Sequence, residues 1–234
     1  MAQSIQNLAV LVDADNVSHS YAHAVFEEIA SIGEPALRRV YGDWSSGQLT
    51  QWLEQVRDLG LVAHQQSANA AGKNATDIGL VIDAMDTLHS GRFDGFVLVS
   101  SDSDFTALAN RIREHGLLAV GIGESKTPDA LRNAFNRFIL VENLLPGKMN
   151  SGTEPKRKPS PKKAESLILS AMDQINPEAE WYHLGQIGQA VISRSPDFDS
   201  RTYGEKKLSD LVKKLGFRTK KRGGNRLDVA RKAA

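Results

Sequence analysis

Three aspartates of the N-terminal half stand just after the ends of two apolar runs, where a parallel sheet would place a binding site. Asp13 is the first polar residue after the run 8–12, and Asp102 and Asp104 follow the run 95–99. Because the carboxyl ends of parallel strands border the ligand-binding crevice of open α/β sheets, we expect these carboxylates to lie close together. Close carboxylates repel one another unless a cation neutralises them. The spacing therefore predicts a metal-binding site.

A fourth carboxylate, Asp77, stands at the start of a predicted helix over 76–90. Asp83 lies six residues further on, about 240° around the axis at ~100° per residue, so the two side chains do not share a face. We take Asp77 as a metal ligand, Asp83 as a candidate for the outer shell of the site, and Asp86 as a surface residue. Lys73 precedes this helix in a loop of small residues, where it could meet a substrate phosphate. A solvated loop lysine explains Lys73 equally well.

The ligand chemistry favours a hard cation. The chain has no cysteine, which excludes disulfides and thiolate metal sites. The remaining donors are carboxylate, amide, hydroxyl, imidazole and water, which suit Mg²⁺ or Mn²⁺ better than structural zinc.

Each acidic motif also has a simpler interpretation, because Ser, Thr, Asp and Asn are common helix caps. Three groups of residues could cap the helix that follows them: Asp15 or Asn16; Thr76 or Asp77; and Ser101, Ser103 or Asp104. Capping does not require four carboxylates at three strand or loop ends on the binding side of one sheet. We therefore favour the metal site.

The elements that must position these residues follow an alternating pattern. Short apolar runs, typical of buried strands, alternate with helix-forming segments. The predicted strands cover 8–12, 37–41, 61–64, 95–99, 117–122 and 138–141, and the predicted helices cover 18–32, 46–59, 76–90, 104–115 and 128–135. This pattern predicts an α/β domain over residues 1–146, with helices on both faces of a parallel sheet.

The sequence changes character after this domain. Residues 147–162 are rich in Pro, Lys and Ser and contain almost nothing to bury, which is typical of a flexible basic linker. Predicted helices follow at 163–175, 183–193 and 204–215, and a Gly-Gly-Asn turn at 223–225 predicts a hairpin. Three helices and a hairpin indicate a small winged-helix-like domain over 163–234.

Charge also divides the chain. Residues 1–150 hold 11 basic and 18 acidic residues, a net charge of −7, whereas residues 151–234 hold 18 and 10, a net charge of +8. The basic part is the one expected to meet a polyanion. No apolar run approaches the ~20 residues that span a bilayer, and the first residues lack the order of a signal peptide. We therefore expect no membrane contact and a cytoplasmic location.

The acidic motifs resemble those of a known family. D-A-D-N at 13–16, K-N-A-T-D at 73–77 and S-S-D-S-D-F at 100–105 are similar to the motifs of the NYN domain, a branch of the PIN-like nucleases. The resemblance covers about residues 5–145 and implies a metal-dependent ribonuclease on a Rossmann-like sheet. The matching family positions are Asp13, Asn16, Asp77, Asp102 and Asp104, and Asp83 matches a further family acid.

The basic C-terminal part resembles the OST-HTH (LOTUS) domain. The resemblance rests on G-Q-I-G-Q-A-V at 185–191 and G-E-K-K-L-S-D-L-V-K-K-L-G-F at 204–217, within about residues 163–231. It implies binding to RNA or to a protein partner.

Together these features give a hypothesis of metal-assisted phosphodiester hydrolysis. Asp13, Asp77 and Asp102 would hold one or two Mg²⁺ or Mn²⁺ ions, which lower the pKa of a bound water and stabilise charge on the phosphate. Asp104 would bind a second ion or orient that water, and Asn16 would position a ligand carboxylate or the scissile phosphate. The basic domain would supply affinity through phosphate contacts. The candidates are Lys206, Lys207, Lys213, Lys214, Arg218, Lys220, Lys221, Arg222 and Arg226; a solvated charged face is the alternative.

Two other functions fit parts of the sequence. D-A-D-N-V also resembles the nucleophile motif of haloacid dehalogenase-type phosphatases, in which Asp13 would be phosphorylated and Asp15 would act as acid and base. That scheme uses neither the acidic helix at Asp77 nor a separate basic domain. The non-enzymatic alternative is an RNA- or protein-binding adaptor that holds a metal without turnover.

Overall fold

The computed structural model of the chain describes residues 6–65, 75–145, 160–223 and 226–232. The chain divides into two compact units, Met1–Lys148 and Met149–Ala234, and each is described by itself. The predicted linker 147–162 lies outside the described residues up to position 159.

The first unit is built on a six-stranded parallel sheet of order β3-β2-β1-β4-β5-β6. Its central strands are buried on both faces, as their continuous apolar runs require. All six predicted strands are confirmed, with the bounds β1 (Asn7–Asp13), β2 (Glu34–Gly42), β3 (Val62–Gln65), β4 (Gly95–Val99), β5 (Leu118–Gly123) and β6 (Arg137–Leu140).

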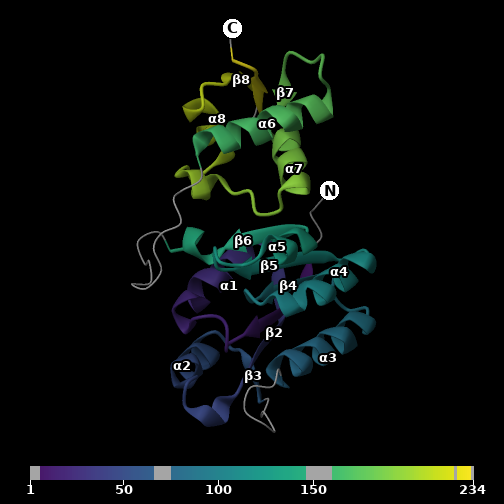
Figure 1. Cartoon of the computed structure of the whole chain (residues 1–234), viewed down its shortest axis with the longest axis vertical. Helices are drawn as coiled ribbons and strands as arrows, with labels where there is room; N and C mark the ends of the chain where they lie inside the picture. The colour runs from purple at the N-terminus through teal and green to yellow at the C-terminus, as the bar shows by residue number, and fades with distance from the viewer. Residues whose placement is uncertain (1–5, 66–74, 146–159, 224–225, 233–234) are drawn as a thin grey trace. The chain divides into compact units, whose positions relative to one another are not determined.

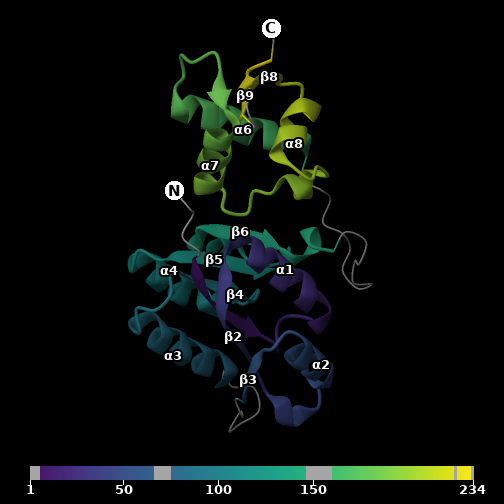
Figure 2. The same cartoon turned by 180° about the vertical axis from the view of Figure 1, so that it is seen from behind.

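Helices cover both faces of this sheet, as Figure 1 shows and Figure 2 repeats from behind. One face packs against α1 (Ala22–Ile32) and α2 (Thr50–Asp58). The opposite face packs against α3 (Ala75–His89), α4 (Thr106–Glu114) and α5 (Asp129–Ala134). The predicted α/β class is therefore confirmed.

The predicted helix at 46–59 was wrong at its start. A 3-10 turn at Trp44–Ser46 ends at Gly47, whose φ of 71° lies in the left-handed region. A left-handed residue interrupts a right-handed helix, so α2 begins only at Thr50.

The second unit contains three helices and a three-stranded antiparallel sheet of order β7-β9-β8. The elements are α6 (Pro161–Ile175), β7 (Tyr182–His183), α7 (Leu184–Arg194), α8 (Leu208–Lys214), β8 (Arg218–Arg222) and β9 (Arg226–Ala230). The predicted hairpin is confirmed by the pairing of β8 with β9, although Gly224 and Asn225 of its turn lie outside the described residues. The short strand β7 was not predicted.

Two helix boundaries in this unit differ from the prediction. The helix α6 begins two residues early, because Ser160 accepts a hydrogen bond from the Lys162 backbone and Pro161 suits a first helical position. The predicted start of α8 at 204 was wrong, because Gly204 has a φ of 86° and ends a separate 3-10 turn.

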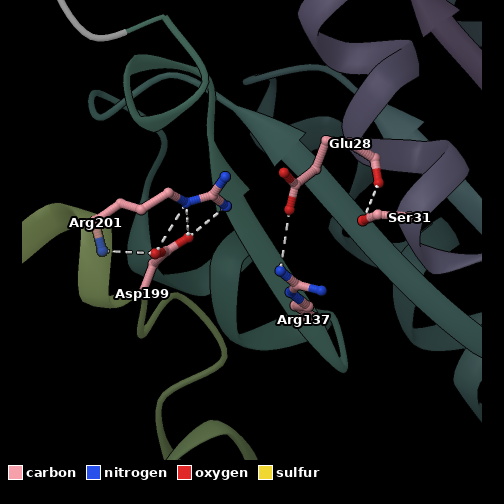
Figure 3. Close-up of polar contacts among 5 residues, drawn as sticks. All are labelled: Glu28, Ser31, Arg137, Asp199 and Arg201. Carbon is pink, nitrogen blue, oxygen red and sulfur yellow. Dashed lines mark hydrogen bonds and ion pairs between the residues drawn. The ribbon is translucent and has the colours of Figure 1, made fainter. Parts of the chain in front are cut away.

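Polar contacts supplement the apolar packing inside each unit (Figure 3). In the first unit, Arg137 of β6 reaches Glu28 of α1 at 3.1 Å, and the Ser31 hydroxyl donates to the Glu28 carbonyl. In the second unit, the Asp199 carboxylate accepts from the backbone and guanidinium of Arg201 at 2.6–3.1 Å. Such half-exposed pairs contribute about 0–1 kcal/mol each, so the buried cores carry the stability. In the part of the chain that the structure describes, no helix has the length and apolar character needed to cross a membrane.

Candidate metal centre

The acidic residues gather where the strand order reverses. The strands β1 and β4 are neighbours, and the chain runs from β1 to β2 on one side of this pair and from β4 to β5 on the other side. Such a switch point opens a crevice outside the strand ends. Asp13 is the last residue of β1, and Ser100 follows the end of β4 directly.

The Asp13 carboxylate is fully buried at this point. Its Oδ2 accepts hydrogen bonds from Asn16 Nδ2 at 2.8 Å and from Ser100 Oγ at 2.7 Å. Its Oδ1 is also buried but has no hydrogen-bond partner among the described residues. Burial raises the pKa of Asp13, and the bonds from Ser100 and Asn16 lower it only in part. A buried carboxylate oxygen without a donor is costly unless a cation meets it.

The pKa of Asp77 responds to the other acidic side chains of the group. The pKa of Asp77 is raised to about 6. Burial is the largest cause, and the negative charges of Asp13, Asp102, Asp104 and Asp15 follow in that order. Asp77 belongs to the first turn of α3, where the helix dipole favours a negative charge. The raised pKa shows that burial and carboxylate repulsion outweigh that effect. Acids from three separate chain segments therefore act on one another here.

The loop after β4 holds its two acids in different ways. The Asp102 Oδ1 accepts from the Asp104 backbone at 2.9 Å and so caps the 3-10 turn Ser103–Phe105 that leads into α4. The Asp102 backbone in turn donates to Ser100 Oγ at 3.1 Å. Asp102 is half-buried and Asp104 exposed. The cap that the sequence assigned to Ser101, Ser103 or Asp104 is therefore Asp102 itself, which also faces the acidic group.

The loop after β1 is tied to the first turn of α3. The Asp15 carboxylate accepts from the Thr76 hydroxyl at 2.9 Å. Neither Asp15 nor Asn16 caps the next helical turn, because Ser18 does so through the Ser20 backbone. Asp15 and Asn16 are thus available to support the crevice rather than a helix end.

The donor set suits a hard cation, although it is not a preformed cage. Among the residues that the structure describes, no three His, Asp or Glu side chains stand close enough together to hold a metal ion. Mg²⁺ is commonly bound through one or two carboxylates and keeps several waters. The Asp13 Oδ1, which has no hydrogen-bond partner among the described residues, is the atom of this group best suited to be such a carboxylate ligand.

Asp83 lies apart from this group. Its carboxylate accepts hydrogen bonds from the Arg39 guanidinium and the Tyr41 hydroxyl, both on β2. Its charge is not among those that raise the pKa of Asp77. Tyr41 pairs with Asp13 in the β1–β2 register, and burial together with the Asp83 bond raises the pKa of the Tyr41 hydroxyl. Asp83 therefore fastens α3 to the strand beside Asp13.

Sequence reasoning missed three of these supporting residues. Ser100 could have been noticed as the first polar residue after the run 95–99. Arg39 and Tyr41 lie in the predicted strand 37–41, and their i, i+2 spacing places them on one face of β2. Lys73 lies outside the described residues.

The basic candidates all belong to the second unit, and all nine are exposed. Three of them form ion pairs: Lys214 with Glu205 at 2.6 Å, Arg218 with Glu180 at 3.4 Å, and Arg222 with Asp228 at 2.5 Å. The other six are Lys206, Lys207, Lys213, Lys220, Lys221 and Arg226.

Comparison with known proteins agrees with this architecture. The NYN domain model matches residues 7–142, and the OST-HTH/LOTUS domain model matches residues 158–229. A solved structure of a protein of unknown function from Vibrio parahaemolyticus is similar, with a TM-score of 0.53 and 19% identity, over 62% of this chain and 98% of that chain. At that identity the likeness shows the fold alone. No curated protein matches. The chain therefore belongs to the NYN domain family of PIN-like nucleases, and its NYN domain is followed by an OST-HTH/LOTUS domain, an RNA-binding module.

Proposed function

We propose that this protein is a ribonuclease that hydrolyses RNA phosphodiester bonds with Mg²⁺ or Mn²⁺. The observation that supports it most is the buried Asp13, whose Oδ1 has no hydrogen-bond partner among the described residues while Oδ2 accepts from two donors. The raised pKa of Asp77, produced in part by Asp13, Asp102 and Asp104, supports a common site for these carboxylates.

Asp13 and one neighbouring acid, Asp102 or Asp77, would hold the metal ion directly, and the other acid would act through the waters of the ion. Asn16 and Ser100 hold the Asp13 Oδ2, so Oδ1 is the atom that would bind the ion. When bound, the ion would lower the pKa of a water and stabilise charge on the phosphate. Asp104, exposed at the start of the 3-10 turn, would accept a proton of that water and orient it. Asn16 would position the Asp13 carboxylate through its hydrogen bond to Oδ2.

The second unit would give the acidic crevice a way to hold RNA. The crevice by itself repels a polyanion, and its residues become attractive only with the ion's charge in place. Residues 151–234 carry a net charge of +8, and phosphate contacts from its exposed lysines and arginines would provide strongly salt-dependent affinity.

Cleavage of labelled RNA with Mn²⁺ tests this proposal when the intact chain is compared with Asp13→Asn and Asp102→Asn. Asp86→Asn is a matched control, because Asp86 is an exposed acid of α3 outside the acidic group. We expect the first two variants to lose at least about a hundredfold in rate, since a catalytic metal contributes several kcal/mol. The control should cleave normally.

Two results would contradict the proposal. RNA binding without cleavage by the intact chain would leave a binding adaptor instead. Full loss of hydrolysis in Asp15→Ala, with a phosphorylated Asp13 in the intact chain, would indicate phosphatase chemistry.

A further inference from the structure

The three-stranded sheet of the second unit has one core face and one outer face, and the strand register separates them. Tyr182, Val229 and Thr219 stand in one row across the sheet, and Tyr182 and Val229 belong to the buried core. Side chains alternate along each strand, so the neighbouring rows point away from that core. Those rows make up the outer sheet face.

The outer sheet face is basic and aromatic. One row contains His183 of β7, Asp228 of β9 and Lys220 of β8. The last row pairs Arg222 with Arg226. His183, Lys220, Arg222 and Arg226 are exposed. Asp228 is buried and forms an ion pair with Arg222, so the exposed charged side chains of these rows are basic.

The remaining row carries an aromatic ring stacked with a cation. Ala230 of β9 pairs with Arg218 of β8, and Trp181 comes directly before β7. The Arg218 guanidinium lies 5.3 Å from the centre of the Trp181 ring. Ala230 is fully buried although it points outward, whereas Trp181 is half-buried and Arg218 exposed. The Arg218 guanidinium also contacts Glu180 at 3.4 Å and the Arg231 carbonyl at 3.1 Å, so these contacts hold a partly exposed aromatic–cation pair beside the basic rows.

We propose that the outer sheet face binds single-stranded RNA and stacks an unpaired base on the Trp181–Arg218 pair. This rests on the proposed function, since RNA is the ligand in both. Proteins bind single strands by combining basic side chains along the backbone with aromatic side chains under the bases. Duplex RNA hides its bases and offers mainly phosphates and 2′-hydroxyls. The exposed face of α8 contributes lysines such as Lys213 but no aromatic residue. The outer sheet face thus selects unpaired segments for the nuclease domain.

The test is binding of the full chain in EDTA, where cleavage cannot interfere. The probes are a fluorescein-labelled unstructured RNA of 20 nucleotides and a duplex of equal length, followed by anisotropy. Trp181→Ala should weaken single-strand binding between about fivefold and about a hundredfold, while Trp181→Phe keeps a ring and most of the affinity. Lys220→Ala should lower the salt slope by about 0.7, and the exposed Lys163→Ala on α6 should leave it unchanged.

Three results would overturn the proposal. The first is that Trp181→Ala binds the single strand as tightly as the intact chain. The second is that Trp181→Ala weakens single-strand and duplex binding equally. The third is that the intact chain binds neither probe. If Trp181→Ala lowers the melting temperature, Arg218→Gln removes the stacked cation from an exposed position and should still weaken single-strand binding. Intact binding without cleavage in Mn²⁺ would refute only the nuclease proposal.

Discussion

Replacing Asp77 with asparagine should stabilise the metal-free chain at neutral pH. The pKa of Asp77 rises from 3.8 to about 6 because burial and the charges of Asp13, Asp102 and Asp104 disfavour its ionised form. At about 1.4 kcal/mol per pKa unit the cost would be about 3 kcal/mol. The side chain reaches solvent, which screens the repulsion and reduces the cost to about 1 kcal/mol. Asparagine has nearly the same shape but carries no charge, so the variant does not bear this cost.

The sign of the pH dependence follows from the raised pKa. Below pH 3.8 the Asp77 carboxyl is protonated in both the folded and the unfolded chain, so it carries no penalty. Above pH 6 it is ionised in both, and the folded chain bears the full penalty. The advantage of Asp77→Asn should therefore grow from about pH 4 to about pH 6 and stay constant above that.

Urea unfolding in EDTA at pH 4.5 and pH 7.5 measures this difference. In a Trp181→Phe background the remaining tryptophans, Trp44 and Trp52, report on the first unit alone. Asp86→Asn, an exposed neutralisation on the same helix, should change little. The reasoning would be refuted if Asp77→Asn were less stable than the parent chain at pH 7.5. It would also be refuted if the two chains differed in unfolding free energy by the same amount at both pH values. Mn²⁺ should then stabilise the chain with Asp77 more than the variant, because it binds only the folded form.

Other variants test the supporting structure. Tyr41→Phe removes a donor to Asp83 and should lower the free energy of unfolding by about 1–3 kcal/mol in urea, whereas an unchanged value would mean that the bond is not formed in solution. Ser100→Ala removes one of the two donors to Asp13 and should lower kcat about 10- to 100-fold at similar KM for RNA; a change in KM alone would contradict its positioning role. Gly121→Ala would place a Cβ 2.5 Å from a phenylalanine ring and should cost about 1–3 kcal/mol by calorimetry, unless the ring can move aside without cost.

The strands of the sheet could be predicted from the sequence because each strand is marked by a short apolar run. The run 95–99 is apolar at every position, and the structure has β4 with the same bounds, buried throughout. The same local signal explains Asp13, which ends β1 as its position after an apolar run predicted. Helix starts were less accurate, since a glycine in the left-handed region, as at Gly47 and Gly204, is not distinguishable in the sequence from any other loop glycine.

Side-chain partners across the fold could not be predicted in the same way. Asp83 meets Arg39 and Tyr41 only because the rotation of α3 about its axis and its packing on β2 bring together residues 42 and 44 positions apart. The Trp181–Arg218 pair depends on the register of three strands, one of which has two residues and no apolar run. Such contacts are set by tertiary packing rather than by local propensity.

The measurement that tests the central claim most directly is the single-turnover rate of RNA cleavage as Mn²⁺ is titrated into the EDTA-treated chain, with Asp13→Asn measured beside it. If the buried Asp13 Oδ1 holds the ion, the intact chain should gain activity along a saturable curve, and the variant should stay at least about a hundredfold slower at every concentration. Equal rates for the two chains, or a rate that does not depend on Mn²⁺, would contradict the account.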